Sequence, residues 1–201
     1  MQAMLGTMTI RLVMITHAPT AATREARFPA DEPLDARGAD AAAGAAGALR
    51  RFDRVLRGPE RRCAETAAGL GLDAAVDPSL ADLDLGAWRG RTLTELEASG
   101  ATELGAWLTD PGKAPHGGES LSSLLERVGG WLDGLAGERV RIAAVTHPAV
   151  VRAAVLQTLG APLSCFWRLD SAPLTQTWLT HNAGRWQLRE TGHPLTTNGS
   201  R

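Results

Sequence analysis

Short apolar runs alternate along the chain with longer stretches of helical periodicity. The run "IAAV" at 142–145 lies between polar residues, which is typical of a central buried strand. Segment 119–135 repeats leucine, valine and tryptophan near the spacing of an amphipathic helix. In segment 148–160, Pro148 in the first turn and Gly160 at the end mark the limits of a further helix.

The same criteria, applied to the whole chain, predict an alternation of strands and helices. The predicted strands cover residues 9–16, 53–58, 74–80, 139–147, 165–170, 175–181 and 184–190. The predicted helices cover residues 35–51, with Asp35 as the cap, and residues 59–70, 119–135 and 148–160. This alternation favours the α/β class, and we expect a three-layer sandwich around a mostly parallel central sheet.

We expect a single domain over residues 1–201, because no linker divides the chain and its length suits one core. Residues 17–33 are predicted to form a loop. Residues 84–118 are rich in Gly, Pro and Trp, and we expect a lid-like insertion with one or two short helices. The ends at 1–8 and 191–201 are expected to be flexible.

Two predicted strands end in the same way. Thr16-His17 follows the first strand, and Thr146-His147 follows the apolar run at 142–145. In open α/β sheets, ligands bind beyond the carboxyl ends of the strands. We therefore expect the fold to bring both imidazoles to one edge of the sheet.

Composition and charge narrow the classes of function. The formal net charge is -1, which gives no electrostatic case for nucleic acid or an anionic membrane as a partner. No apolar run is long enough to span a membrane, and the N-terminus lacks the pattern of a signal peptide. Cys63 and Cys165 are the only cysteines and make no disulfide framework, so we expect a cytoplasmic protein. Arginine supplies nearly all the positive charge, which suits phosphate chemistry, but a genomic bias explains this equally well.

Five motifs occur in the order that is known from one family. They are "LVMITHAPT", "RGPERRCAETAAGL", "LADLDLGAWRGRT", "HGGES" and "AVTHPAVVRAAV". With them the chain resembles the histidine phosphatase superfamily, the phosphoglycerate mutase-like proteins. The family's first two motifs are Arg-His-Gly and a Ser-Pro turn followed by Arg-Ala-x-Gln-Thr-Ala, and its last is Ser-His-Gly. The resemblance covers nearly the whole chain and implies the phosphoglycerate mutase-like fold.

The resemblance also implies a phosphomonoesterase that hydrolyses a small phosphorylated metabolite through a phosphohistidine, with no cofactor and no metal ion. His17 would be the nucleophile, and His147 would hold a phosphate oxygen. Asp82 would protonate the leaving alcohol, and burial near phosphate would raise its pKa and keep it protonated for the first step. The other residues implied to contact the phosphate or line the rim are Arg62, Arg27, Thr16 and Glu119.

Several site positions depart from the family pattern. Thr16 stands where the family has Arg, so two charged hydrogen bonds from a guanidinium to the phosphate are missing. Each such bond contributes roughly 1.5–3 kcal/mol. Ala18 and Pro148 each replace a Gly, and Pro148 also lacks an N–H. Asp84 lies close to Asp82 in sequence, so either could be the acid.

Other functions therefore stay open. The departures also suit a degenerate member that binds a phosphorylated ligand or a partner without turnover. A metal site of His17, His147 and Asp82 is a third hypothesis, which the lack of a local His pair and the charge of Arg62 disfavour. A homodimer is compatible with the sequence, whereas the substrate cannot be named from it.

Overall fold

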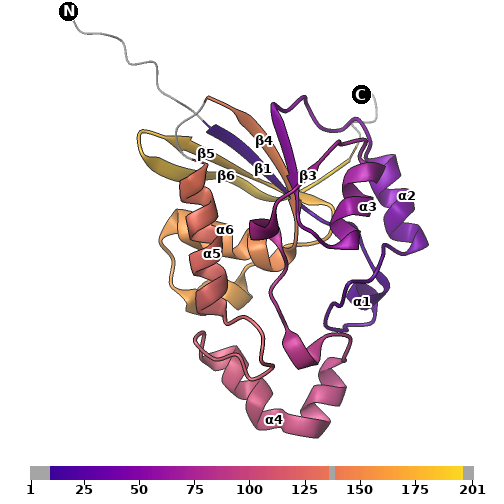
Figure 1. Ribbon diagram of the computed structural model, residues 1–201, viewed down its shortest axis with the longest axis vertical. Coiled ribbons are helices and arrows are strands. Elements are labelled where there is room, and N and C mark those ends of the chain that lie inside the picture. Colours follow the sequence, from indigo (N-terminus) through magenta and orange to yellow (C-terminus); the bar gives the residue numbers. More distant parts are fainter. Residues whose placement is uncertain (1–9, 136–138, 197–201) are drawn as a thin grey trace, which may run out of the picture.

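The computed structural model describes residues 10–135 and 139–196, and it is built around a six-stranded sheet of order β3-β2-β4-β1-β5-β6 (Figure 1). The strands are β1 (Ile10–Thr16), β2 (Arg54–Arg57), β3 (Ala75–Val76), β4 (Arg141–Thr146), β5 (Thr175–Asn182) and β6 (Arg185–Pro194). The four strands from β3 to β1 run parallel, and β5 is antiparallel to β1. The α/β class with a mostly parallel sheet is thereby confirmed.

Helices cover both faces of the sheet and complete the three layers (Figure 1). The helices are α1 (Ala21–Arg24), α2 (Ala36–Gly44), α3 (Arg61–Gly69), α4 (Leu93–Thr109), α5 (Leu121–Gly134) and α6 (Pro148–Leu159). Alternate residues of β1 point to opposite faces of the sheet, where they pack in two separate hydrophobic cores. Leu12 and Met14 pack in the core under α5 and α6, whereas Val13 and Ile15 pack with the buried residues of α3.

The register of β1 and β4 determines where the two strand-to-histidine junctions lie. Thr16 pairs with Thr146 in parallel register, so the residues that follow them leave the sheet at the same edge. The backbone N–H of His17 still donates to the Thr146 carbonyl at 2.9 Å. His147 is the N-cap of α6, which turns back over the sheet from this point. The prediction that the two strand-to-histidine junctions meet is confirmed.

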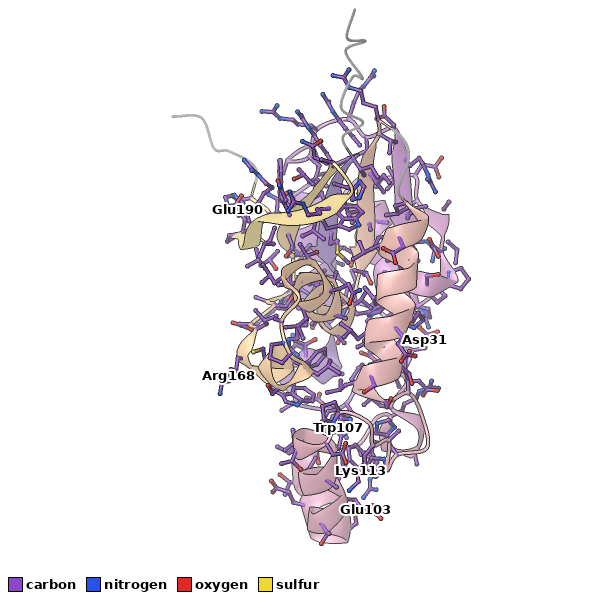
Figure 2. All side chains as sticks on the ribbon, turned by 90° about the vertical axis from the view of Figure 1, so that its left-hand side faces the viewer. Asp31, Glu103, Trp107, Lys113, Arg168 and Glu190 are labelled. Carbon is purple, nitrogen blue, oxygen red and sulfur yellow. The ribbon has the colours of Figure 1, made fainter. Side chains whose placement is uncertain are left out.

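Segment 84–118 contains more regular structure than the sequence indicated. Instead of one or two short helices, α4 runs over 17 residues from a capping box made by Thr92 and Glu95. Aromatic contacts tie α4 to the body of the protein, and the rings of Trp107 and Trp167 lie 4.6 Å apart. Figure 2 shows Trp107 of α4 and the nearby Lys113 at the opposite end of the molecule from Glu190 on β6.

Other boundaries also differ from the predictions, and the helix predicted over 35–51 ends at Gly44. The expected strand at 165–170 is a 3₁₀ helix, Leu163–Arg168. Its apolar residues Leu163, Phe166 and Leu169 recur every third position, which suits that helix, and they pack on the main core. The expectation of a flexible end is wrong for residues 191–194, because β6 continues to Pro194. Residues 1–8 lie outside the described part of the chain.

No helix within residues 10–135 and 139–196 combines the length and the apolar character that crossing a membrane requires.

Candidate active site

His17 lies directly beyond β1, and only 6% of its surface is exposed. Its Nδ1 is 2.8 Å from the carbonyl oxygen of Ala18. A carbonyl can only accept, so Nδ1 carries the hydrogen and Nε2 keeps its lone pair. Burial, with the nearby charge of His147, lowers the pKa of His17 to about 4. His17 is therefore a neutral imidazole with a free nucleophilic nitrogen at neutral pH.

His147 has the opposite protonation state. Its ring is fully buried and its centroid lies 5.3 Å from that of His17. Nε2 donates to the Glu60 carboxylate at 2.7 Å, and Nδ1 lies 3.4 Å from an oxygen of Asp82. Burial alone would lower the pKa of His147, but the Asp82 carboxylate, the neighbouring Cys63 and the hydrogen bond to Glu60 outweigh it, and the pKa rises to about 10.

Arg62 supplies the guanidinium of the site from the first turn of α3, where only 2% of it is exposed. Its Nη2 donates to Asp82 at 2.7 Å, and its Nη1 donates to the carbonyl of Ala30. Its Nε lies 3.3 Å from Nδ1 of His147. Both nitrogens carry hydrogen when His147 is charged, so an anion placed between them would accept from both.

Asp82 completes the cluster, and its protonation differs from our expectation. Burial favours the protonated form, but the charges of His147 and Arg62 dominate and lower the pKa of Asp82. Asp82 is thus ionised before a substrate binds, whereas the expected raised pKa concerns the phosphate-bound state and stays a prediction. The neighbouring Asp84 is about half exposed and pairs with Arg89 at 2.8 Å. Of the two candidate acids, only Asp82 contacts the cluster.

The structure does not bring Thr16, Arg27 or Glu119 into this cluster. The Thr16 hydroxyl donates to the carbonyl of Ala172 at 2.6 Å and so fixes β1 to the start of β5. Arg27 pairs with Glu25 and donates to the carbonyl of Gly90. None of the three is among the residues that line the cavity of about 170 Å³ next to Arg62 and Asp82. The structure therefore places these three side chains outside the cluster, and their contact with phosphate stays a prediction.

Glu119 instead supports the segment that presents Asp82. Its carboxylate accepts two hydrogen bonds from Arg127 of α5, at 2.7 and 2.9 Å. Arg127 in turn donates to the carbonyls of Ser79 and Ala81 at 2.8 and 3.0 Å. These bonds satisfy carbonyl groups of the irregular backbone before Asp82 and fix its position relative to α5.

Glu60 is a site residue that the sequence reasoning missed. One carboxylate oxygen accepts from His147 and the other accepts from the backbone N–H of Asp82 at 2.9 Å. A signal was present, because Gly58 stands where the family motif has Ser. A Cβ at Gly58 would lie 2.9 Å from the Glu60 carboxylate and 3.0 Å from Nε2 of His147. The missing side chain leaves the space in which Glu60 reaches the histidine.

Glu60, Cys63 and His147 place potential metal ligands within 4.8 Å of one another. The 2.7 Å contact between Nε2 and the carboxylate oxygen is a hydrogen-bond distance. Two ligands of one tetrahedral zinc ion stand farther apart, at roughly 3.3 Å or more, given metal–ligand bonds of about 2.0–2.3 Å. The geometry of this trio therefore fits a shared proton better than a metal ion.

A cavity of about 170 Å³ opens beside the cluster, and neither His17 nor His147 is among the residues that line it. Arg62, Asp82 and Glu60 form its inner part, whereas Asp31 and Arg89 lie toward the outside. Both signs of charge are thus present at its lining. Its size suits a small group such as a phosphoryl moiety.

The fold and this cluster define a class of protein. A neutral imidazole, a charged imidazole, a guanidinium and a carboxylate converge at the carboxyl edge of a parallel sheet. Such a site suits an oxyanion that is attacked by the neutral imidazole and held by the two cations. This is the arrangement expected of a phosphoryl-transfer enzyme of the α/β class.

Comparison with known proteins identifies the family. The model of the histidine phosphatase superfamily (branch 1) matches residues 12–193, so the chain belongs to this superfamily, a family of phosphatase enzymes. A glucosyl-3-phosphoglycerate phosphatase of Mycolicibacterium vanbaalenii is 30% identical over 172 residues, which cover 76% of each protein. The native structure of the mycobacterial glucosyl-3-phosphoglycerate phosphatase has a TM-score of 0.80 and 27% identity, and the match covers 92% of this chain and 99% of that one.

A bifunctional protein of Mycobacterium tuberculosis is also similar, with 29% identity over 170 residues. The match covers 79% of this chain but only 47% of that protein. The chain therefore spans about half the length of the first of its curated relatives.

Proposed function

We propose that the protein is a phosphomonoesterase that hydrolyses a small phosphorylated metabolite through a phosphohistidine on His17. The observation that carries this proposal is the pair of imidazoles in opposite protonation states. His17 has a free lone pair on Nε2, and charged His147 lies 5.3 Å away between ring centroids. A nucleophile and a cation for the phosphoryl oxygens are therefore already in place.

In the first step, Nε2 of His17 attacks phosphorus and the P–O bond to the alcohol breaks. Arg62 and His147 donate to the non-bridging oxygens, where negative charge is held in the transition state. A phosphoryl group beside Asp82 brings negative charge close to its carboxylate, which raises the pKa of Asp82 and lets it take up a proton. The protonated Asp82 then donates this proton to the leaving alkoxide.

In the second step, water attacks the phosphohistidine. The Asp82 carboxylate removes a proton from the water, and the P–N bond to His17 breaks to release phosphate. Throughout, the Ala18 carbonyl holds the Nδ1 proton of His17, so the ring returns to the same tautomer. The N-terminus of α6, which follows His147, directs its dipole toward the same anion.

The size of the cavity supports a small substrate. About 170 Å³ accommodates a phosphoryl group with a short organic part, and Arg89 and Asp84 lie among the residues that line it. The named relative that acts on a glucosyl-phosphoglycerate supports a phosphorylated metabolite as the substrate class.

A second candidate function, binding without turnover, is favoured by the conformation of Thr16. Its hydroxyl is committed to the backbone of residues 172 and 175, so it gives no donor to the phosphate. No neighbouring arginine replaces the missing fork, because Arg24 pairs with Asp35 and Arg27 pairs with Glu25. The site thus has the guanidinium of Arg62 but not the one that the family pattern places at position 16. This loss lowers the affinity for the transition state.

Hydrolysis of p-nitrophenyl phosphate and of a panel of metabolite phosphates separates the two functions, with His17→Ala as the control. The proposal predicts phosphate release that requires His17 and labelled phosphate that remains on the denatured wild-type protein after acid-free quenching. Binding of orthophosphate without any His17-dependent release between pH 4 and 9 would instead identify a degenerate member.

A further inference from the structure

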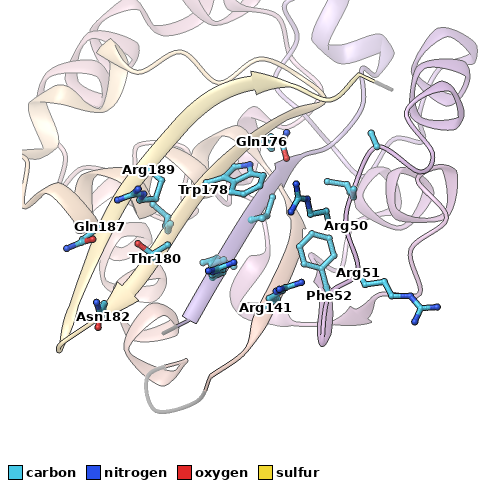
Figure 3. A pocket seen from close by; sticks show the side chains of 16 residues that line it. Arg50, Arg51, Phe52, Arg141, Gln176, Trp178, Thr180, Asn182, Gln187 and Arg189 are labelled. Carbon is cyan, nitrogen blue, oxygen red and sulfur yellow. The ribbon is translucent and has the colours of Figure 1, made fainter. Parts of the chain in front are cut away.

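A second hollow, of about 590 Å³, lies on the sheet over β1 and β5 (Figure 3). On this face Val13 and the neighbouring apolar residues are buried with α3. Trp178 is the partner of Val13 across β1 and β5, so it points to the same face, yet 39% of it is exposed. The helices therefore cover only part of this face, and the hollow occupies the part that they leave open.

The hollow is remote from the candidate active site. Arg11 and Arg141, which line it, are register partners at the beginning of β1 and β4. His17 and His147 follow the other ends of these two strands. From Arg11 to His17 the strand rises by about 20 Å, at roughly 3.3 Å per residue.

Five arginines surround this hollow, which we call the arginine groove. They are Arg11, Arg50, Arg51, Arg141 and Arg189. Figure 3 shows Arg50 and Arg51 on the loop after α2, on one side of the groove, and Arg189 of β6 on the other. Among the ion pairs of residues 10–135 and 139–196, none involves any of the five.

The groove also lacks negative charge in its lining, since no Asp or Glu of the described chain belongs to it. The pairing of Arg11 with Arg141 places two like charges side by side, which destabilises a sheet unless an anion lies between them. The net charge of -1 conceals this concentration of positive charge, and the Asp53 carboxylate accepts from the backbone N–H of Arg141 at 2.8 Å, not from its guanidinium.

Flat apolar surfaces and amide groups accompany the arginines. Trp178 lies in the floor between the arginines, and Phe52 follows Arg51 along the rim (Figure 3). Gln176 and Asn182 each have a buried side-chain oxygen without a hydrogen-bond partner in the described structure. Aromatic rings can stack with a planar base, guanidinium groups can bind phosphates, and amides can pair with base edges.

We propose that the arginine groove binds nucleoside phosphates, either free or within a single strand. Its volume lies within the range of about 300–1,000 Å³ that is typical of small-ligand pockets. Cations at two sides and an exposed indole in the floor suit a ligand that carries several negative charges and a flat ring. This second site stands independently of the proposed phosphatase reaction.

The test uses the His17→Ala variant, so that the active site does not hydrolyse the probe. The probes are a fluorescent N-methylanthraniloyl-ATP and a fluorescein-labelled oligothymidylate about 12 nucleotides long. We expect saturable binding that weakens as salt rises, because phosphate contacts release counterions. Binding of both probes indicates a site for free nucleotides, and binding of the oligonucleotide alone indicates a site for a strand.

Two sets of variants locate this binding. Arg50→Glu with Arg189→Glu, and separately Trp178→Ala, are each expected to weaken binding about tenfold or more. Arg168→Glu makes, at one exposed residue outside the groove, the change of charge that each of the two arginine substitutions makes, and it is expected to leave the affinity unchanged. The absence of saturable binding at low salt, or an equal loss in Arg168→Glu, would overturn the proposal.

Discussion

His17 and His147 lie side by side, yet their surroundings give them opposite charges. Around His17 the only strong partner is the Ala18 carbonyl, which is neutral. Around His147 the carboxylates of Glu60 and Asp82 approach both ring nitrogens. One residue type thus supplies both a nucleophile and a fixed cation, because the local charge decides the protonation state.

The role of Asp82 as the acid can be tested with leaving groups of different basicity. Asp82→Asn is expected to slow hydrolysis of alkyl phosphates by about 10²–10⁴-fold, because an alkoxide needs a proton to leave. Hydrolysis of p-nitrophenyl phosphate should fall much less, since nitrophenolate leaves without one. Steady-state kcat/KM for both substrates measures the difference.

Asp84→Asn is the matched control, because the Asp84 carboxylate is about half exposed and accepts from Arg89 and from the backbone N–H of Gly86, outside the cluster. Equal losses on both substrates in Asp82→Asn, or a larger loss in Asp84→Asn, would assign the acid elsewhere.

Glu60 is expected to keep His147 charged as the pH rises. Glu60→Gln removes one of the carboxylates beside His147, so the pKa of His147 should fall from about 10. The alkaline limb of the kcat/KM profile should then move to lower pH, and orthophosphate should bind more weakly at pH 9 than at pH 6.

Glu126→Gln removes the same charge from the exposed surface of α5 and serves as the control. An alkaline limb that does not move in Glu60→Gln would show that Glu60 does not hold the proton on His147.

At the scale of elements, the position of Asp82 depends on α5. Arg127 and Glu119 connect this helix to the backbone carbonyls of residues 79 and 81, so the two elements share one hydrogen-bond network. A tight crossing adds to this connection, because a Cβ at Gly118 would stand 2.0 Å from the carbonyl oxygen of Asp84. The Gly-rich motif HGGES before α5 therefore needs glycine at position 118 to avoid a steric clash.

Arg127→Gln is expected to lower the free energy of unfolding by about 2 kcal/mol or more, since it removes several charged hydrogen bonds. The same change should lower kcat more than it changes KM, because Asp82 moves while Arg62 and His147 keep their own partners. Urea unfolding and steady-state kinetics measure the two effects.

Arg91→Gln is the control, because Arg91 donates to Ser99 on the exposed surface of the 84–118 segment. A stable and fully active Arg127→Gln protein would contradict the proposed support of the Asp82 segment.

Most elements could be predicted from periodicity and from their caps, as Asp35 at α2 and Pro148 at α6 illustrate. The 3₁₀ helix Leu163–Arg168 could not, because a short apolar run looks the same in a strand and in a buried helical turn. The length of α4 was underestimated, because its Gly residues hid a helix that tertiary aromatic contacts stabilise.

The candidate site was predictable only in part, for a physical reason. His17, His147 and Arg62 are held by strand ends and a helix start, whose positions follow from the fold, whereas Asp82 lies in the irregular segment after the 3₁₀ helix Pro78–Leu80. The orientation of Thr16 depends on a backbone carbonyl 156 positions away, and no local pattern reveals such a partner. The role of Glu60 likewise depends on the space left by Gly58.

At the scale of the whole molecule, the same titrations affect stability. The folded pKa of His147 is about 10, above its ordinary 6.5, so its stabilisation is complete below pH 6.5 and is lost as the pH rises through 10. His17 has a folded pKa of about 4, so stability is lost as the pH falls from 6.5 through 4. Glu60, at about 2, adds a loss from pH 4.5 downward.

The free energy of unfolding is therefore expected to be greatest near pH 6–7 and to decline on both sides. Denaturant unfolding between pH 4 and 10 measures it, and His147→Gln should flatten the alkaline side. A stability that still rises between pH 7 and 9 in the wild-type protein would contradict the raised pKa of His147.

The ring nitrogens of the two histidines offer the most direct test of the whole account, by ¹⁵N NMR of the labelled protein during titration with orthophosphate. The account predicts that at neutral pH His17 is neutral and protonated on Nδ1, that His147 carries both protons, and that both signals shift saturably with phosphate. Two neutral rings, or signals that phosphate leaves unchanged, would contradict it.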